Sequence, residues 1–160
     1  MKKKFIPALL FLLSVLWIIF IFSNSLEDSV ESGEKSAWVY KLVRIFIPWV
    51  SELFIRKLGH FAEFAILGWL LSASVCSIIS PLSKGNSKKL FELFYILPAV
   101  FTVACCDELL QNFSEGRYPA FTDVLIDTSG GLFAILSAMG ILLLIIRKRK
   151  IRNRSSSQLG

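Results

Sequence analysis

The chain has 160 residues, enough for one compact domain, and 54% of them are hydrophobic, with a mean hydropathy of +0.63. This apolar content is too high for a soluble globular domain and indicates an integral membrane protein. The net charge of +6 would also suit a nucleic-acid-binding protein. The basic residues cluster beside the apolar segments, however, so we expect the lipid bilayer as a partner and no nucleic acid.

Four apolar segments are long enough to cross about 30 Å of hydrocarbon, which takes about 20 helical residues. The sequence therefore predicts an all-α fold, an integral membrane four-helix bundle with spans at about residues 5–22, 61–79, 90–106 and 124–146. Three lysines precede the first span, as basic residues precede the apolar region of a signal peptide. The apolar stretch is longer than that region usually is, however, and Ser23-Asn24-Ser25 is a poor cleavage site. We interpret it as an uncleaved span. Pro98 inside the third span predicts a kink.

Between the first two spans, the segment at about residues 36–57 is amphipathic and is interrupted by Pro48. Its aromatic residues Trp38, Tyr40 and Trp49 suit the bilayer interface. We expect one or two short amphipathic helices lying on the outer leaflet, or alternatively packing over the bundle as a lid. Ser25, before this segment, is a candidate helix cap.

Twelve of the 18 basic residues lie in three clusters: before the first span, between the second and third spans, and after the fourth. The positive-inside rule then places both termini in the cytoplasm, with the first and third connections outside. We expect residues 1–146 to form a single transmembrane domain and residues 147–160 a basic cytoplasmic tail. The cysteines, Cys76, Cys105 and Cys106, all fall inside spans, where we expect small buried hydrophobes without a disulfide.

Polar residues gather at the outer end of the predicted bundle. They are Lys57, His60, Glu63, Asp107, Glu108, Gln111, Arg117, Asp123 and Asp127. The spacing of three puts Lys57, His60 and Glu63 on an arc of about 120° of one helix, and a spacing of four puts Asp123 and Asp127 on one face of another. We therefore expect one polar cluster at the extracytoplasmic mouth, which three helices and one loop would build as a ligand-binding site.

The carboxylates of this cluster exceed its cations by two or three. Such an excess leaves three possibilities: some carboxylates are protonated, a divalent cation binds among them, or a cationic ligand completes the balance. The candidate metal ligands are Asp107, Glu108, Asp123 and Asp127.

Small residues follow the two aspartates on the same face of the fourth span. Gly130, Ala134 and Ala138 lie at intervals of four. Such a face lets another helix approach closely, either within the fold or in a dimer.

Four motifs together resemble the VanZ-like family of small membrane proteins. They are Lys57-x-x-His60-x-x-Glu63, Asp107-Glu108-x-x-Gln111, Gly116-Arg117 and Asp123-x-x-x-Asp127-x-x-Gly130, and the likeness runs from the FSNS at residues 22–25 through the fourth span. The resemblance implies a role in the bacterial cell envelope, because the founding member is linked to resistance to teicoplanin, a glycopeptide antibiotic with a lipid tail. The family often has asparagine where this chain has Asp127, so a metal, a cationic ligand or a salt bridge to Arg117 becomes more plausible.

Three hypotheses remain at this point. In the first, Lys57 and Arg117 hold a phosphate or carboxylate of a cell-wall precursor or a lipoglycopeptide at the outer leaflet. In the second, the protein is a membrane hydrolase or transferase, with candidate catalytic residues His60, Glu63, Asp107 and Glu108; the single histidine excludes a two-histidine phosphatase mechanism. In the third, the cluster is an ion-pair network that only holds the helices together.

Overall fold

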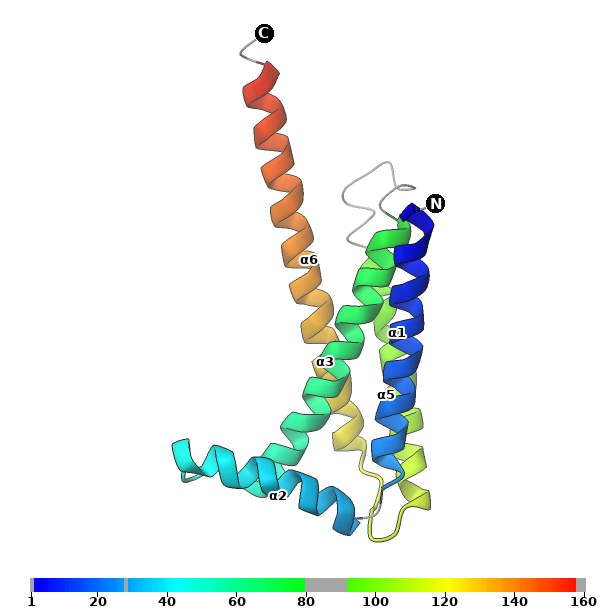
Figure 1. Cartoon of the computed structure of the whole chain (residues 1–160), viewed down its shortest axis with the longest axis vertical. Coiled ribbons are helices and arrows are strands. Elements are labelled where there is room, and N and C mark those ends of the chain that lie inside the picture. The colour runs from blue at the N-terminus through cyan, green and yellow to red at the C-terminus, as the bar shows by residue number, and fades with distance from the viewer. Residues whose placement is uncertain (1, 28, 80–91, 158–160) are drawn as a thin grey trace.

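The computed structural model describes residues 2–27, 29–79 and 92–157, and every element in these ranges is helical (Figure 1). The elements are α1 (Lys2–Ser25), α2 (Ser29–Phe46), α3 (Glu52–Ile79), α5 (Ile96–Leu110), the short 3-10 helix η1 (Gln111–Phe113) and α6 (Phe121–Ser157). Four stretches are long and apolar enough to cross a membrane: Phe5–Ser25, Glu52–Ile78, Glu92–Phe113 and Phe121–Lys148. The predicted all-α four-helix membrane bundle is therefore confirmed.

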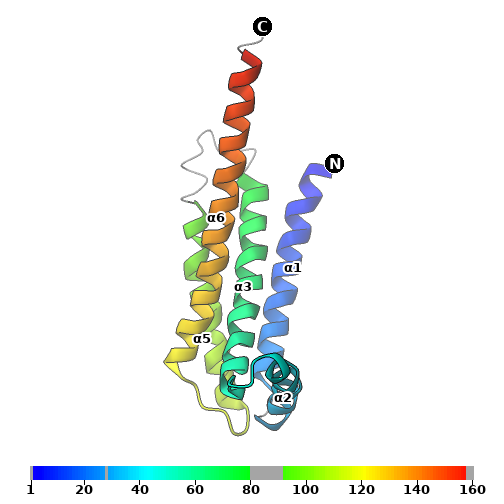
Figure 2. The same cartoon turned by 90° about the vertical axis from the view of Figure 1, so that its left-hand side faces the viewer.

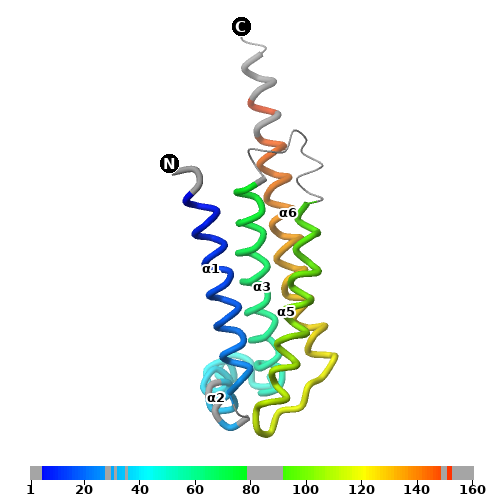
Figure 3. Tube along the Cα trace, turned by 90° about the vertical axis from the view of Figure 1, so that its right-hand side faces the viewer, coloured from blue at the N-terminus to red at the C-terminus, as the bar shows by residue number. Residues whose placement is uncertain are grey.

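The four long helices run side by side, with α3 between α1 and the pair formed by α5 and α6 (Figure 2). Helix α2 lies across one end of the bundle, beside the connection from η1 to α6. The start of α1 and the end of α6 both lie at the opposite end (Figure 3). The structure therefore has one end formed by α2 and the α5–α6 connection, and this is the end where the polar cluster was predicted.

The core is thin and apolar, as expected of a small bundle whose outer surface faces lipid. Phe64, Leu67, Val100 and Ile135 are fully buried at its centre. Many other large apolar side chains on the long helices point outward, including Phe11 and Leu144. Exposed apolar surface of this extent would be unfavourable in water and suits a hydrocarbon environment.

Helices α3 and α6 approach closely because glycine and alanine lie at their contact. A Cβ added at Gly130 would collide with the carbonyl oxygen of Phe61, and one added at Gly68 would lie 2.8 Å from the Ala134 Cβ. Ala134 is fully buried. The small-residue face predicted on the fourth span therefore packs against α3 within the same chain, which brings Asp123 and Asp127 toward Lys57 and His60.

The observed helix bounds differ from the predicted ones at the polar end. Helix α3 begins at Glu52, well before residue 61, because the Ser51 hydroxyl accepts a hydrogen bond from the Phe54 amide at 3.2 Å and caps the helix. Lys57 and His60 consequently lie within α3, as their helical spacing predicted. The hydropathy pattern alone had placed the start of the span after them. The predicted segment 36–57 is divided between α2 and α3, and the break lies around Pro48 as expected.

The third span is interrupted as expected: residues 92–94 are helical, and a turn three residues before Pro98 separates them from α5. The chain turns at Tyr95, α5 begins at Ile96, and Pro98 falls in its first turn, where a missing N–H costs little.

The cysteine prediction is wrong at one position. Cys106 is exposed, because it lies on the outward face of α5, while Cys76 and Cys105 are partly buried. None of the three forms a disulfide within the described residues.

The predicted basic tail is helical through Ser157, where α6 ends. At about 1.5 Å per residue, α6 is longer than the hydrocarbon layer is thick, and its last turns extend beyond the other helices in Figure 1.

Gly130→Ala should destabilise the protein, because the added methyl group meets the backbone of Phe61, which cannot move aside as a side chain could. We expect a loss of about 1–3 kcal/mol of unfolding free energy, typical of an overpacked contact. The matched control is Gly140→Ala, also on α6, where an added Cβ meets nothing within 4 Å. Thermal unfolding in detergent measures both variants; equal melting temperatures would contradict the close α3–α6 contact.

Candidate functional site

All nine polar residues named from the sequence lie at the end of the bundle covered by α2, and contacts connect most of them to one another. The site is built by α1, α3, α5, the loop after η1 and the start of α6.

Two successive turns of α3 face two successive turns of α6. The Lys57 Nζ donates a hydrogen bond to the Asp123 Oδ1 at 2.5 Å, and both side chains are partly exposed. One turn deeper, the His60 Nδ1 lies 3.8 Å from the Asp127 Oδ1. Asp123 lies inside the first turn of α6 and pairs with a lysine, so it does more than cap a helix.

The end of α1 connects the other helices. The Asn24 side-chain amide donates to the Glu63 Oε1 at 2.8 Å, and the Ser25 hydroxyl donates to the Asp107 Oδ1 at 2.6 Å. The Ser25 carbonyl accepts hydrogen bonds from the Ser114 hydroxyl at 2.8 Å and from Arg117 at 3.4 Å. Sequence reasoning named Ser25 only as a candidate cap and did not identify Asn24. Two polar residues at the end of an otherwise apolar span were the signal available.

Glu108 is fully engaged in structural contacts. Its Oε1 accepts the Ala120 backbone N–H at 2.6 Å, just before α6 begins, and its Oε2 accepts the Gln111 amide at 3.1 Å. Gln111 thus orients a neighbouring carboxylate. Gly116 has a φ of 73°, a left-handed conformation that favours glycine, and it turns the chain so that Arg117 points back toward α1.

His60, Asp107 and Asp127 form a second kind of group, which we call the buried triad. Asp107 and Asp127 are fully buried. Within the described part of the chain, the His60 Nδ1, the Asp107 Oδ2 and both Asp127 carboxylate oxygens lack a hydrogen-bond partner. One ligand atom from each residue lies within 4.8 Å of the others. Of the four predicted metal ligands, the structure therefore brings Asp107 and Asp127 together, and it adds His60, whereas Glu108 and Asp123 bond elsewhere.

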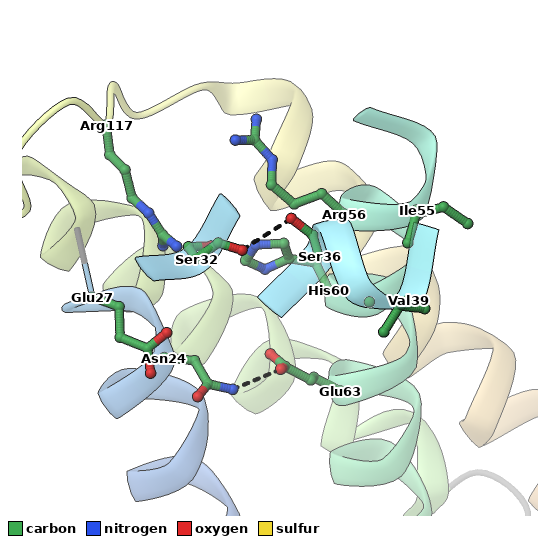
Figure 4. Close-up of a pocket in the computed structure, with 11 residues that line it drawn as sticks. Asn24, Glu27, Ser32, Ser36, Val39, Ile55, Arg56, His60, Glu63 and Arg117 are labelled. Carbon is green, nitrogen blue, oxygen red and sulfur yellow. Dashed lines mark hydrogen bonds between the residues drawn. The ribbon is translucent and has the colours of Figure 1, made fainter. Parts of the chain in front are cut away.

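Two cavities border His60, the member of the buried triad that lines them. The larger has a volume of about 260 Å³ and lies between α1, α2 and α3, with Asn24, Ser32, Ser36 and Glu63 in its lining. The smaller, of about 190 Å³, lies toward the loop and is lined by Gln111, Tyr118 and Asp123. Arg56, His60 and Arg117 line both cavities. Figure 4 shows Arg117 entering from the loop and Arg56 from α3, with His60 beneath them.

The two arginines place positive charge at these cavities. Burial, and after it the positive charge of Arg56, lowers the pKa of Arg117, which still remains protonated at neutral pH. Sequence reasoning did not identify Arg56, because it lies next to Lys57 in the chain and only the rotation of α3 shows which of the two reaches the cavities. Two arginines that border one cavity are favourable where an anion lies within reach of both.

Four membrane-compatible helices around one polar end define a small multi-pass membrane protein. The sequence model of the VanZ/LLP1 family matches residues 8–147, which is most of the chain, so this protein belongs to that family. The family recognised from the four motifs is therefore confirmed. Comparison with curated proteins and with solved structures gave no match.

Proposed function

We propose that this VanZ-family membrane protein binds the anionic head group of a lipid-linked molecule at its polar end and thereby contributes to resistance to teicoplanin-type glycopeptides. The observation that carries this proposal is that Arg56 and Arg117 line the same two cavities. Guanidinium groups bind phosphate and carboxylate through paired hydrogen bonds. Lys57, the other cation that we expected to bind the anion, is already paired with Asp123.

The lining of the larger cavity supports a head group that carries hydroxyls as well as charge. Asn24, Ser32 and Ser36 supply amide and hydroxyl groups, Glu27 and Glu63 supply carboxylates that can accept hydrogen bonds from hydroxyls, and Val39 and Ile55 supply apolar surface. A volume of about 260 Å³ is slightly below the range of about 300–1,000 Å³ for small-molecule sites, so the ligand portion inside the cavity must be small. The cavity therefore suits a phosphate or diphosphate with an attached sugar, and a glycopeptide could insert only part of its structure.

The exposed apolar faces of the long helices would accommodate the lipid tail of such a molecule. A lipid-linked cell-wall precursor has this combination of a long apolar chain and an anionic head group. We therefore favour the precursor as the ligand, with the lipid-tailed antibiotic as a competitor for the same surface.

This function requires the polar end to face outward across the bacterial plasma membrane, with both termini in the cytoplasm. The positive-inside rule supports that orientation, because the lysines in the first turn of α1 and the basic residues of late α6 lie at the end opposite the polar cluster (Figure 1).

Intact cells that express Tyr118→Cys in a cysteine-free background should react with a membrane-impermeant thiol reagent. Residue 118 is 87% exposed in the loop before α6, so its labelling reports sidedness and not burial. Arg152→Cys, exposed on late α6, should be labelled only after lysis. The reverse pattern would place the polar end in the cytoplasm.

A second candidate function, a hydrolase or transferase acting on the same lipid, is favoured by the unpartnered atoms of the buried triad beside the arginine-lined cavities. In its hydrolytic form, water would attack the terminal phosphorus of a polyprenyl diphosphate, the P–O bond to the leaving polyprenyl phosphate would break, and a proton would pass from the water to that leaving group. His60 or a triad carboxylate would hold the proton in transit. Release of phosphate from a polyprenyl diphosphate by the purified protein tests this candidate.

Arg117→Gln and Arg56→Gln should each weaken binding of a polyprenyl diphosphate by about 10- to 100-fold, the range expected for a lost hydrogen bond between charged groups. Arg44→Gln is the matched control, because Arg44 stacks on Tyr40 of α2 and lines neither cavity. Native mass spectrometry of the purified protein with increasing lipid measures the affinity, and the uncharged polyprenol is the control ligand. Unchanged affinity in both variants would contradict the head-group site.

The same variants test the cellular role in a teicoplanin-sensitive Gram-positive host. Wild-type protein should protect against teicoplanin more than against vancomycin, which lacks the lipid tail, and Arg117→Gln at equal membrane abundance should not. Equal protection by Arg117→Gln would show that resistance does not depend on the proposed site. Absence of protection by the wild type would contradict the resistance role.

A further inference from the structure

We propose that His60, Asp107 and Asp127 bind one divalent cation of the Zn²⁺ or Mn²⁺ type where α3, α5 and α6 meet. The binding of the cation follows from the buried triad alone. The part that the cation would play toward a lipid head group rests on the proposed function.

The geometry of the buried triad is close to that of a metal site. Two ligand atoms at about 2.1 Å from one ion lie at most about 4.2 Å apart. The His60 Nδ1 and the Asp127 Oδ1 are 3.8 Å apart, within this limit. One ligand atom from each of the three residues falls within 4.8 Å of the others, so small side-chain rotations complete the set.

The missing hydrogen-bond partners are an independent observation that points to a ligand. Asp127 is fully buried, and neither of its oxygens accepts a hydrogen bond from any described residue. Asp107 uses only its Oδ1, toward Ser25, and its Oδ2 remains unpartnered. Buried carboxylate oxygens without donors cost several kcal/mol each unless another charge compensates. A cation at the triad would contact an oxygen of each aspartate.

The charge balance of the polar end favours the same compensation. Its carboxylates are Glu27, Glu63, Asp107, Glu108, Asp123 and Asp127, and its cations are Arg56, Lys57 and Arg117. With His60 neutral, the formal charge of these residues is −3, which one divalent cation reduces to −1. A bound metal is also compatible with the neutral imidazole that serves as a ligand.

The donor set selects the kind of cation. An imidazole nitrogen suits Zn²⁺ and its neighbours among the transition metals, whereas carboxylates also suit Mn²⁺ and Mg²⁺. One nitrogen and two carboxylates therefore favour Zn²⁺ or Mn²⁺ over Ca²⁺, which prefers six to eight oxygens. Three protein ligands leave at least one coordination position for water or for an oxygen of the head group. His60 borders both cavities, so this position is accessible from the site of the two arginines.

The test is metal binding by the purified full-length protein, first stripped with a chelator and then equilibrated with Mn²⁺ or Zn²⁺. Elemental analysis should find about one ion per chain in the wild type and less than a tenth as much in Asp107→Asn and Asp127→Asn. Asp123→Asn is the matched control, because Asp123 belongs to the same cluster but pairs with Lys57 outside the triad. It should retain the ion.

A second measurement needs no triad variant and so does not depend on how the variants fold. Pulsed electron paramagnetic resonance of the Mn²⁺-loaded wild type should show coupling to a ¹⁴N nucleus, since His60 is the only histidine in the chain. Wild-type protein that binds no more metal than Asp127→Asn, or that shows no nitrogen coupling, would overturn the proposal.

The proposals of a metal site and of a head-group site can be tested separately. The metal measurements contain no lipid, and Arg117→Gln should keep the ion while losing the polyprenyl diphosphate. Wild-type protein that binds the metal but no lipid would therefore contradict the proposed function without contradicting the metal site.

Discussion

The close contact between α3 and α6 determines the rest of the structure. Gly68 and Gly130 allow the two helix backbones to approach, and any larger residue at Gly130 would meet the carbonyl oxygen of Phe61. Both helices run in the same direction from the polar end, so residues at spacings of three on α3 and four on α6 meet in successive turns. The outer turn forms an ion pair, and the next turn brings His60 against Asp127.

This arrangement separates the polar end into two groups with different physical properties. Lys57 with Asp123, Glu63 with Asn24, and Glu108 with Ala120 and Gln111 are partnered, and they are the contacts expected of a network that holds helices together. The buried triad has several unpartnered oxygens at full burial. A structural network accounts for the first group only, because unpartnered buried carboxylates destabilise a fold. The second group is consistent with a ligand.

The number and type of the helices could be predicted from the sequence, because runs of about 20 apolar residues have few alternatives to a membrane helix. The first residue of α3 could not be predicted in this way. Arg56, Lys57 and His60 are polar, so hydropathy places the start of the span after them, whereas the Ser51 cap lets the helix begin before them. The motifs identified most of the polar cluster. They did not show that Arg56 lines the cavities, which depends on how α3 is rotated.

Long-range pairing was the main information missing from the sequence. Ser25 and Asp107 are separated by 82 positions, and no local pattern links them. Arg117 was a candidate partner for Asp127, but in the structure it donates to the Ser25 carbonyl, while Asp127 faces His60. A periodic pattern can therefore place residues on a helix face, but the choice of partner follows from the packing of α3 against α6.

The most direct test of the central claim, that the buried triad serves a ligand and not the fold, is the thermal stability of Asp127→Asn in the presence of a chelator. Removing an uncompensated buried charge should leave the melting temperature unchanged or raise it by a few degrees, while metal binding is lost. If the cluster instead holds the helices together, Asp127→Asn should lower the melting temperature substantially, since breaking a buried pair costs about 3–5 kcal/mol. A variant whose melting temperature is unchanged or raised would support the account, and a variant whose melting temperature falls by the amount expected for a broken buried pair would contradict it.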